Sequence, residues 1–233
     1  MVAARADLFD GCPTAHALDL IGDRWALMVV RELLIGPKRF TDLRRGLPRI
    51  SRNVLSQRLE DLESAGALSR RTLPPPSPSA VYELTNRGLE LEAVLQAIGR
   101  WGVRSPLLPE SDTLGADTFV LGLRAQYNAT AAKNLTADYE LRIAEDVFAF
   151  HIDYGRLTVR RGACDEPNMV VDVDTGAMAA VARGARPLAT ALAASASATG
   201  DDVSCFAELF AHPERPDPQL PAPRLVNDQL AAT

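Results

Sequence analysis

The residues best suited to chemistry lie on one predicted helix that begins after Ser51. Its apolar residues Leu55, Leu59 and Leu62 recur at i, i+4 and i+7, and Gly66 follows as a stop, which predicts an amphipathic helix capped by Ser51. The opposite face is polar. Asn and Gln can pair with adenine in the major groove, Arg with guanine and Ser with either. The side chains that we assign to base edges are Arg52, Asn53, Ser56 and Gln57.

The neighbouring segments predict a frame that would hold this helix against DNA. A shorter helix with Phe40 and Leu43 inward precedes it, and a Gly-Leu-Pro turn joins the two, which predicts a helix-turn-helix. After Gly66, two strands joined by a proline-rich loop at 74–78 predict an exposed hairpin, or wing. The alternative for any single arginine is an ordinary solvated charge. The side chains that we assign to phosphates or to the wing are Lys38, Arg39, Thr41, Arg44, Arg45, Arg49, Arg58, Arg70 and Arg71.

The charge of the chain is unevenly distributed. The 233 residues carry a net charge of −5, yet residues 1–105 hold 15 basic and 12 acidic side chains, and the remainder holds 10 and 18. A phosphate backbone meets the local field rather than the total charge. The acidic whole therefore does not exclude DNA as a partner of the first half.

The first half resembles the HxlR family of bacterial regulators, over about residues 8–104. One departure is Gly22-Asp23-Arg24-Trp25, where the family usually has Gly-Gly-Lys-Trp, but a cation still stands beside the tryptophan. The resemblance implies a MarR-like winged helix-turn-helix that binds double-stranded operator DNA as a homodimer. The residues that carry it are Cys12-Pro13, Ala17, Ile21, Gly22, Trp25, Leu33, Phe40, Leu43, Ile50, Ser51, Leu55, Arg58, Leu59, Leu62, Gly66 and Tyr82-Glu83-Leu84-Thr85.

A capped helix is predicted from Thr85 to Gly102. In the family, the helices that flank the winged core pair two subunits, so the resemblance implies that this helix takes part in the dimer. The alternative is that it only completes the core of one subunit.

The composition changes after a proline-containing linker at 105–111, and residues 112–212 resemble a sterol-carrier-protein-like domain. The pattern is a helix, several strand-like segments, helices of small residues and a last helix. The resemblance implies an antiparallel sheet that encloses an apolar cavity for a hydrophobic small-molecule effector, and the alternative is close packing of the same residues. The candidate cavity residues are Phe119, Leu123, Phe148, Phe150, Ile152, Met178, Leu192 and Phe206.

Catalytic and metal-binding patterns find little support. The three histidines are scattered, the three cysteines are far apart, and no nucleophile-elbow or phosphate-loop motif is present, so we expect no enzyme activity, cofactor or metal. We see no secretion signal and no run long enough to cross a bilayer, which favours a cytoplasmic protein. Cys12 precedes a helix whose positive end could make it a reactive thiolate, so it is a candidate redox sensor; the alternative is a small buried packing residue.

The sequence therefore predicts an α+β protein of two domains and a tail. Residues 1–104 are expected to form a winged helix-turn-helix for DNA binding and dimerisation, 112–212 a ligand-binding α+β domain, and 213–233 a proline-rich tail. The predicted function is transcriptional regulation. One rival is a carrier of hydrophobic ligands whose winged helix is an interaction module. The other rival is an enzyme that acts inside the carboxyl-terminal cavity.

Overall fold

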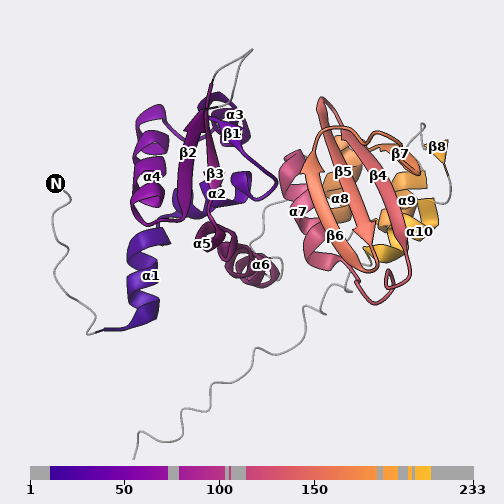
Figure 1. The fold of residues 1–233 in the computed structure, drawn as a ribbon, viewed down its shortest axis with the longest axis horizontal. Helices are drawn as coiled ribbons and strands as arrows, with labels where there is room; N and C mark the ends of the chain where they lie inside the picture. Colours follow the sequence, from indigo (N-terminus) through magenta and orange to yellow (C-terminus); the bar gives the residue numbers. More distant parts are fainter. Residues whose placement is uncertain are drawn as a thin grey trace, which may run out of the picture.

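The amino-terminal part of the molecule is a three-stranded sheet surrounded by helices (Figure 1). The structure, a computed structural model, describes residues 11–72, 79–102, 105, 114–182, 186–193, 199–200 and 203–210. The strand order is β1-β3-β2, and both pairs are antiparallel. The elements in chain order are α1 (Pro13–Ile21), α2 (Arg24–Leu33), β1 (Lys38–Arg39), α3 (Phe40–Gly46), α4 (Arg52–Ser64), β2 (Leu68–Thr72), β3 (Ala80–Leu84), α5 (Asn86–Leu89) and α6 (Leu91–Gly102).

Helix α2 lies at the centre of this part because apolar side chains cover most of its surface. Val29 and Val30 are fully buried, and Leu43 of α3 and Leu55 and Leu62 of α4 belong to the same core. Each such side chain contributes about 1.5–3 kcal/mol by its removal from water. The core therefore fixes α3, α4 and the β2–β3 hairpin in the winged helix-turn-helix arrangement. The proline run expected at the tip of the wing lies outside the described residues.

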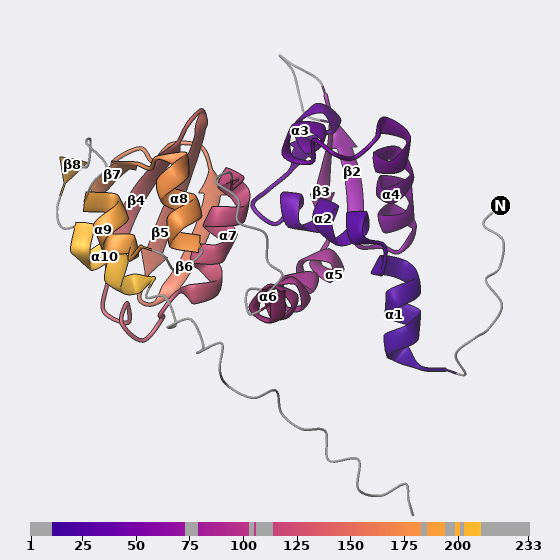
Figure 2. The ribbon, with the colours of Figure 1, turned by 180° about the vertical axis from the view of Figure 1, so that it is seen from behind.

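The carboxyl-terminal part is a five-stranded sheet whose helices gather on one face, as Figure 2 shows from behind. The strand order is β6-β5-β4-β7-β8. Along β5, Phe148, Phe150 and Ile152 are fully buried while His151 is exposed, which confirms the predicted alternation. The elements are α7 (Ala116–Gln126), β4 (Thr136–Ile143), β5 (Asp146–Asp153), β6 (Arg156–Arg161), β7 (Met169–Asp172), α8 (Thr175–Ala182), α9 (Leu188–Ala193), β8 (Thr199–Gly200) and α10 (Val203–Leu209).

The sheet departs from the expected antiparallel arrangement at one strand, because β7 pairs parallel with β4. The chain leaves β6 at one edge and crosses the sheet within residues 162–168, so that β7 runs in the same direction as β4. The backbone N–H of Cys164 donates to the buried carboxylate of Glu140 over 2.8 Å and holds this crossing in place. Alternation predicts that a segment is a strand, but it does not predict the direction of its neighbour.

The two parts touch through the segment after α2 and through α7. Ile35, which follows α2, is 4% exposed and packs in the same apolar cluster as Phe119, Val120 and Leu123 of α7. No helix among the described residues is long and apolar enough to cross a membrane. The predicted tail at 213–233 lies outside the described residues.

Candidate nucleic-acid interface

Helix α4 presents a polar face to solvent because its leucines anchor the other face. Ser51 caps it by accepting the backbone N–H of Val54 over 3.3 Å, as the sequence predicted. Leu55, Leu59 and Leu62 are at most 2% exposed. On the outer face Arg52, Asn53 and Gln57 are exposed, and Ser56 is half-buried. The helix therefore presents hydrogen-bonding side chains at its amino-terminal end, where a major groove would meet them.

Asp61, one turn along α4, orients two of the predicted DNA-binding residues, and sequence reasoning missed it. Its carboxylate accepts the side-chain amide N–H of Gln57 over 2.9 Å and pairs with Arg58 at 2.9 Å. Arg58 also lies 3.8 Å from Asp23 and is only 26% exposed. Its charge is largely neutralised within the protein, so it is a weaker phosphate ligand than its exposed neighbours. The spacing i, i+4 between Gln57 and Asp61 was the signal that could have found this pair.

The other assigned residues surround the amino-terminal end of α4 and the wing. Exposed side chains at the end of β1, on α3 and on the loop that follows are Arg39, Thr41, Arg44, Arg45 and Arg49. Within the part of the chain that the structure describes, Arg44, Arg49 and Arg52 form no ion pair. On the hairpin, Arg71 pairs with Glu83 at 2.7 Å, and Arg70 lies over the ring of Tyr82.

Lys38 was expected to contact a phosphate, but the structure places it in the interior, between the two parts of the molecule. Its side chain is only 6% exposed, and its ammonium pairs with Glu32 at 2.7 Å and with Asp117 of the other part. A buried ammonium needs such carboxylate partners, because an unpaired charge would be costly to remove from water. We therefore leave Lys38 out of the proposed interface.

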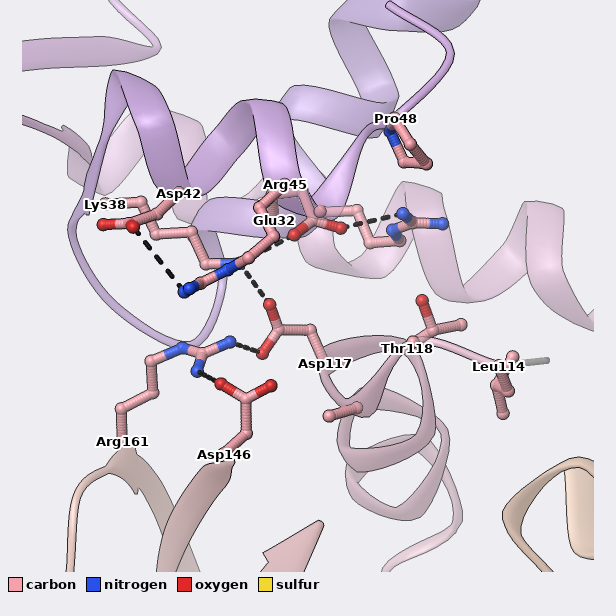
Figure 3. Close-up of a pocket in the computed structure, with 14 residues that line it drawn as sticks. Glu32, Lys38, Asp42, Arg45, Pro48, Leu114, Asp117, Thr118, Asp146 and Arg161 are labelled. Atoms are coloured by element: carbon pink, nitrogen blue, oxygen red, sulfur yellow. Dashed lines mark hydrogen bonds and ion pairs between the residues drawn. The ribbon is translucent and has the colours of Figure 1, made fainter. Parts of the chain in front are cut away.

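A cluster of charges joins the two parts of the molecule beside a cleft of about 670 Å³, and sequence reasoning did not foresee it (Figure 3). We call Glu32, Lys38, Asp117, Asp146 and Arg161 the Asp117 cluster. Asp117, at the start of α7, accepts hydrogen bonds from Lys38 and from Arg161, and Arg161 pairs with Asp146 at 2.7 Å. The only signal in the sequence was Glu32, an acidic residue near the end of the largely apolar α2.

Burial and charge oppose each other in the Asp117 cluster. Burial raises the pKa of the Asp117 carboxyl above its ordinary value, although the charges of Lys38 and Arg161 lower it in part. Burial also acts upward on Glu32, but the attraction of Lys38 and the hydrogen bonds from Lys38 and Arg31 outweigh it, so the pKa of Glu32 is lowered. Burial lowers the pKa of Arg161, whereas Asp117 and Asp146 outweigh it and raise that pKa overall.

Cys12 is exposed at the amino-terminal end of α1 and is not the buried packing residue that was the alternative. Hydrogen bonds from the backbone of Ala15 and Thr14 lower the pKa of its thiol. Burial, followed by the charge of Asp138, instead raises the pKa of the Cys164 thiol. The pKa of Cys12 is therefore shifted toward that of a reactive cysteine, and the pKa of Cys164 is shifted toward that of an inert one.

The eight candidate cavity residues gather in one buried apolar cluster between the sheet and its helices. Each is at most 3% exposed. The ring of Phe206 lies 5.1 Å from that of Tyr139 and 5.8 Å from that of Phe150, centroid to centroid. These contacts show that the candidates share one core, and whether that core opens for a ligand stays a prediction.

Helix α6 carries an apolar stripe that faces solvent. Val94, Ile98 and Trp101 recur at i, i+4 and i+7 and are 41%, 47% and 76% exposed, and Leu89 just before the helix is 45% exposed. Leu18 on α1 is 61% exposed. An apolar stripe of this width on one helix is typical of a contact between subunits.

Comparison with known proteins finds one matching family and several similar proteins. The family model described as HxlR-like helix-turn-helix matches residues 20–106. The uncharacterized HTH-type transcriptional regulator YdeP of Bacillus subtilis is 35% identical over 97 residues, which are 42% of this chain and 76% of YdeP. The HTH-type transcriptional regulator YodB of the same organism is 36% identical over 91 residues, 39% of this chain and 81% of YodB.

Solved structures give similar partial matches. The reduced form of the transcriptional regulator YodB from B. subtilis is 33% identical, covers 42% of this chain and 97% of its own, and has a TM-score of 0.39. A structure described as the redox regulator HypR in its oxidized form is 32% identical, covers 40% of this chain and 97% of its own, and has a TM-score of 0.38.

Proposed function

The chain belongs to the HxlR-like helix-turn-helix family and is a DNA-binding transcriptional regulator, and we propose that it reads operator DNA as a homodimer through α4 and the wing. In this proposal Arg52, Asn53, Ser56 and Gln57 contact base edges in the major groove. Exposed arginines of α3 and the hairpin contact the phosphates on either side.

The outward polar face of α4 is the observation that carries the proposal. Its leucines are buried on the other side, so the helix cannot rotate to hide Asn53 and Gln57 without exposing its core residues. Arg44, Arg49 and Arg52 surround this face without an ion-pair partner among the described residues. Unpaired cations around a hydrogen-bonding helix supply both the attraction to a duplex and the means to read it.

The apolar stripe of α6 supports the homodimer. Pairing two copies of Val94, Ile98 and Trp101 would remove this exposed surface from water. A two-fold dimer would place two α4 helices on half-sites about 34 Å apart, one turn of DNA. Disruption of the stripe by Trp101→Ser would then weaken both self-association and operator binding.

The proposal is tested by fluorescence anisotropy of the full chain with DNA from upstream of its own gene, and with a scrambled duplex, at two salt concentrations. We expect preferential binding to the upstream DNA at the higher salt. The Arg44→Ala variant should weaken binding to both duplexes alike and reduce the salt dependence by about one counterion. Arg156→Ala, an exposed arginine of β6, is the matched control and should bind as the parent does. Equal binding of both duplexes by the parent would contradict the proposal.

For the carboxyl-terminal part we propose a sterol-carrier-like domain that holds a hydrophobic effector. The supporting observation is that the candidate cavity residues lie in one apolar cluster, with Phe206 in contact with Phe150 and Tyr139. Native mass spectrometry of the freshly purified chain checks for a bound apolar molecule. Such a molecule would stay with the folded chain in the gas phase and would be released when the chain unfolds. A ligand whose addition changes operator affinity supports regulation, and one that binds with no effect on DNA supports the carrier.

We also propose that Cys12 reacts with oxidants or electrophiles. Its exposure and lowered pKa support this role. The relatives include a protein whose structure is described as that of a redox regulator, and a quinone-bound structure of YodB.

A further inference from the structure

We propose that the Asp117 cluster couples the carboxyl-terminal domain to DNA reading: docking of α7 on the amino-terminal domain holds β1 and α3 in the position that binds operator DNA. Loss of that docking weakens binding. The inference rests on the proposed function, because it concerns the regulation of the same DNA-reading surface.

Helix α7 is bonded to the amino-terminal domain at both of its ends. At its start, Asp117 accepts a hydrogen bond from Lys38 of β1. Near its end, Arg124 pairs with Glu92 of α6 at 2.5 Å and donates to the backbone carbonyl oxygen of Leu34, which follows α2, over 3.3 Å. Between these contacts Ile35 packs into the apolar cluster around α7. One helix of the second domain is therefore attached to β1, to α6 and to the segment that follows α2 in the first domain.

Lys38 connects this docking to the elements that would read DNA. In the backbone register of β1 and β3, Lys38 lies opposite Tyr82 and Arg39 lies opposite Val81. Arg39 is also the N-cap residue of α3. Arg70 of the wing lies over the ring of Tyr82. A displacement of Lys38 therefore moves the start of α3 and the strand that carries the wing.

The chemistry of the cluster favours two discrete states. Glu32, Lys38 and Asp117 have side chains that are only 4%, 6% and 7% exposed. A carboxylate buried in this way is stable only when its cationic partners are in place. When α7 leaves, Lys38 keeps Glu32, while Asp117 keeps Arg161 and gains water. All five residues of the cluster line the cleft (Figure 3), so water can reach them without opening of either core.

The position of the second domain decides the sign of the coupling. Figures 1 and 2 both show α7 on the side of the amino-terminal domain remote from α4. In the docked arrangement Asn53, Gln57 and Arg44 remain exposed. Docking therefore leaves the DNA-reading face free and supports the elements behind it, so undocking weakens operator binding.

The experiment compares full-length variants that differ in the contacts between domains. Asp117→Asn combined with Arg124→Gln removes the charge from both polar attachments of α7 and so weakens them. We expect about a tenfold loss of operator affinity by anisotropy, within the usual range of coupling between sites. We also expect a larger radius of gyration by small-angle X-ray scattering. Arg156→Gln is the matched control, since it removes the charge of an exposed arginine of β6 that forms no ion pair among the described residues, and it should change neither measurement.

The outcomes separate this inference from the proposed function. A parent chain that does not distinguish its upstream DNA overturns the proposed function. If the parent binds, a double variant that expands yet binds equally well overturns the coupling, as does a double variant with an unchanged radius of gyration. Arg124→Gln alone, at a side chain 24% exposed, is a milder change that keeps the test available if the double variant does not fold. Its affinity should fall between those of the parent and the double variant, and parental affinity in this single variant, when it alone folds, would contradict the coupling.

Discussion

At the scale of single residues, Asp61 determines which hydrogen bonds Gln57 can offer to DNA. Because the amide nitrogen of Gln57 donates to the Asp61 carboxylate over 2.9 Å, its amide oxygen is left to accept a hydrogen bond from a base. The exocyclic amino groups of adenine and cytosine are such donors in the major groove. Gln57 is thus held by the protein before DNA arrives, which lowers the entropy that binding would otherwise cost.

Gln57→Ala should reduce the discrimination between operator and mutated sites by about 1–3 kcal/mol, because one base contact is lost. The measurement is anisotropy with a series of duplexes that differ at single base pairs. Gln96→Ala on α6 is a matched control, since Gln96 also donates to an acidic residue one turn away, Glu92, over 3.3 Å. Unchanged discrimination in Gln57→Ala would show that α4 does not read the sequence through this side chain.

Cys12 should react with iodoacetamide before Cys164 in the native chain. Hydrogen bonds from the backbone of Ala15 and Thr14 lower the pKa of the Cys12 thiol, whereas burial raises that of Cys164. The thiolate is the reactive form, so the rate of Cys12 modification should reach its plateau at a lower pH than that of an ordinary thiol. Peptide mass spectrometry after timed quenching measures both rates. Protection of Cys12 at neutral pH would remove its proposed role.

At the scale of elements, α4 depends on its buried side. Leu59 is 2% exposed within the amino-terminal core. Leu59→Ala should lower the free energy of unfolding by about 2–5 kcal/mol, because it leaves a cavity in a packed site. Val54→Ala on the same helix, at a side chain 37% exposed, should change it by less than about 0.5 kcal/mol. Urea unfolding followed by circular dichroism compares the two, and equal losses would place the core elsewhere on the helix.

The elements that could be predicted from sequence are those whose signal is local. Ser51, the leucine spacing and Gly66 define α4 within a few turns, and the strands of the wing follow directly. The direction of β7 and the burial of Lys38 were not predictable in this way, because both depend on segments far along the chain. Lys38 and Asp117 are 79 residues apart, and neither carries a pattern that points to the other.

At the scale of the whole molecule, the two domains meet at α7, where apolar contacts and ion pairs lie side by side. Ile35 extends the core of one domain into the other, and the Asp117 cluster lies beside it. Burial of the charged groups costs free energy that only complete pairing offsets. The junction therefore favours one relative position of the domains, and changes in protonation at the junction should be visible in the stability of the chain.

Substitution of Glu32 tests whether charge pairing at the junction stabilises the folded chain. Burial raises the pKa of the Glu32 carboxyl, but Lys38 and Arg31 outweigh that effect, so the pKa is lower in the folded chain than in the unfolded one. Such a group stabilises the fold above its unfolded pKa of about 4.3 and loses this contribution as the pH falls through its folded pKa. Glu32→Gln should therefore lower the free energy of unfolding by about 3 kcal/mol at pH 7, and the difference from the parent should shrink below about pH 4.

Urea unfolding at a series of pH values measures this difference directly. Asp117, whose pKa is raised by burial, acts in the opposite sense over the same range, but both chains carry it and its effect largely cancels in the comparison. Glu90→Gln is the matched control, because Glu90 is exposed and forms no ion pair among the described residues. A difference between the parent and Glu32→Gln that is the same at pH 7 and pH 3 would mean that the Glu32 carboxylate does not hold the junction through its charge.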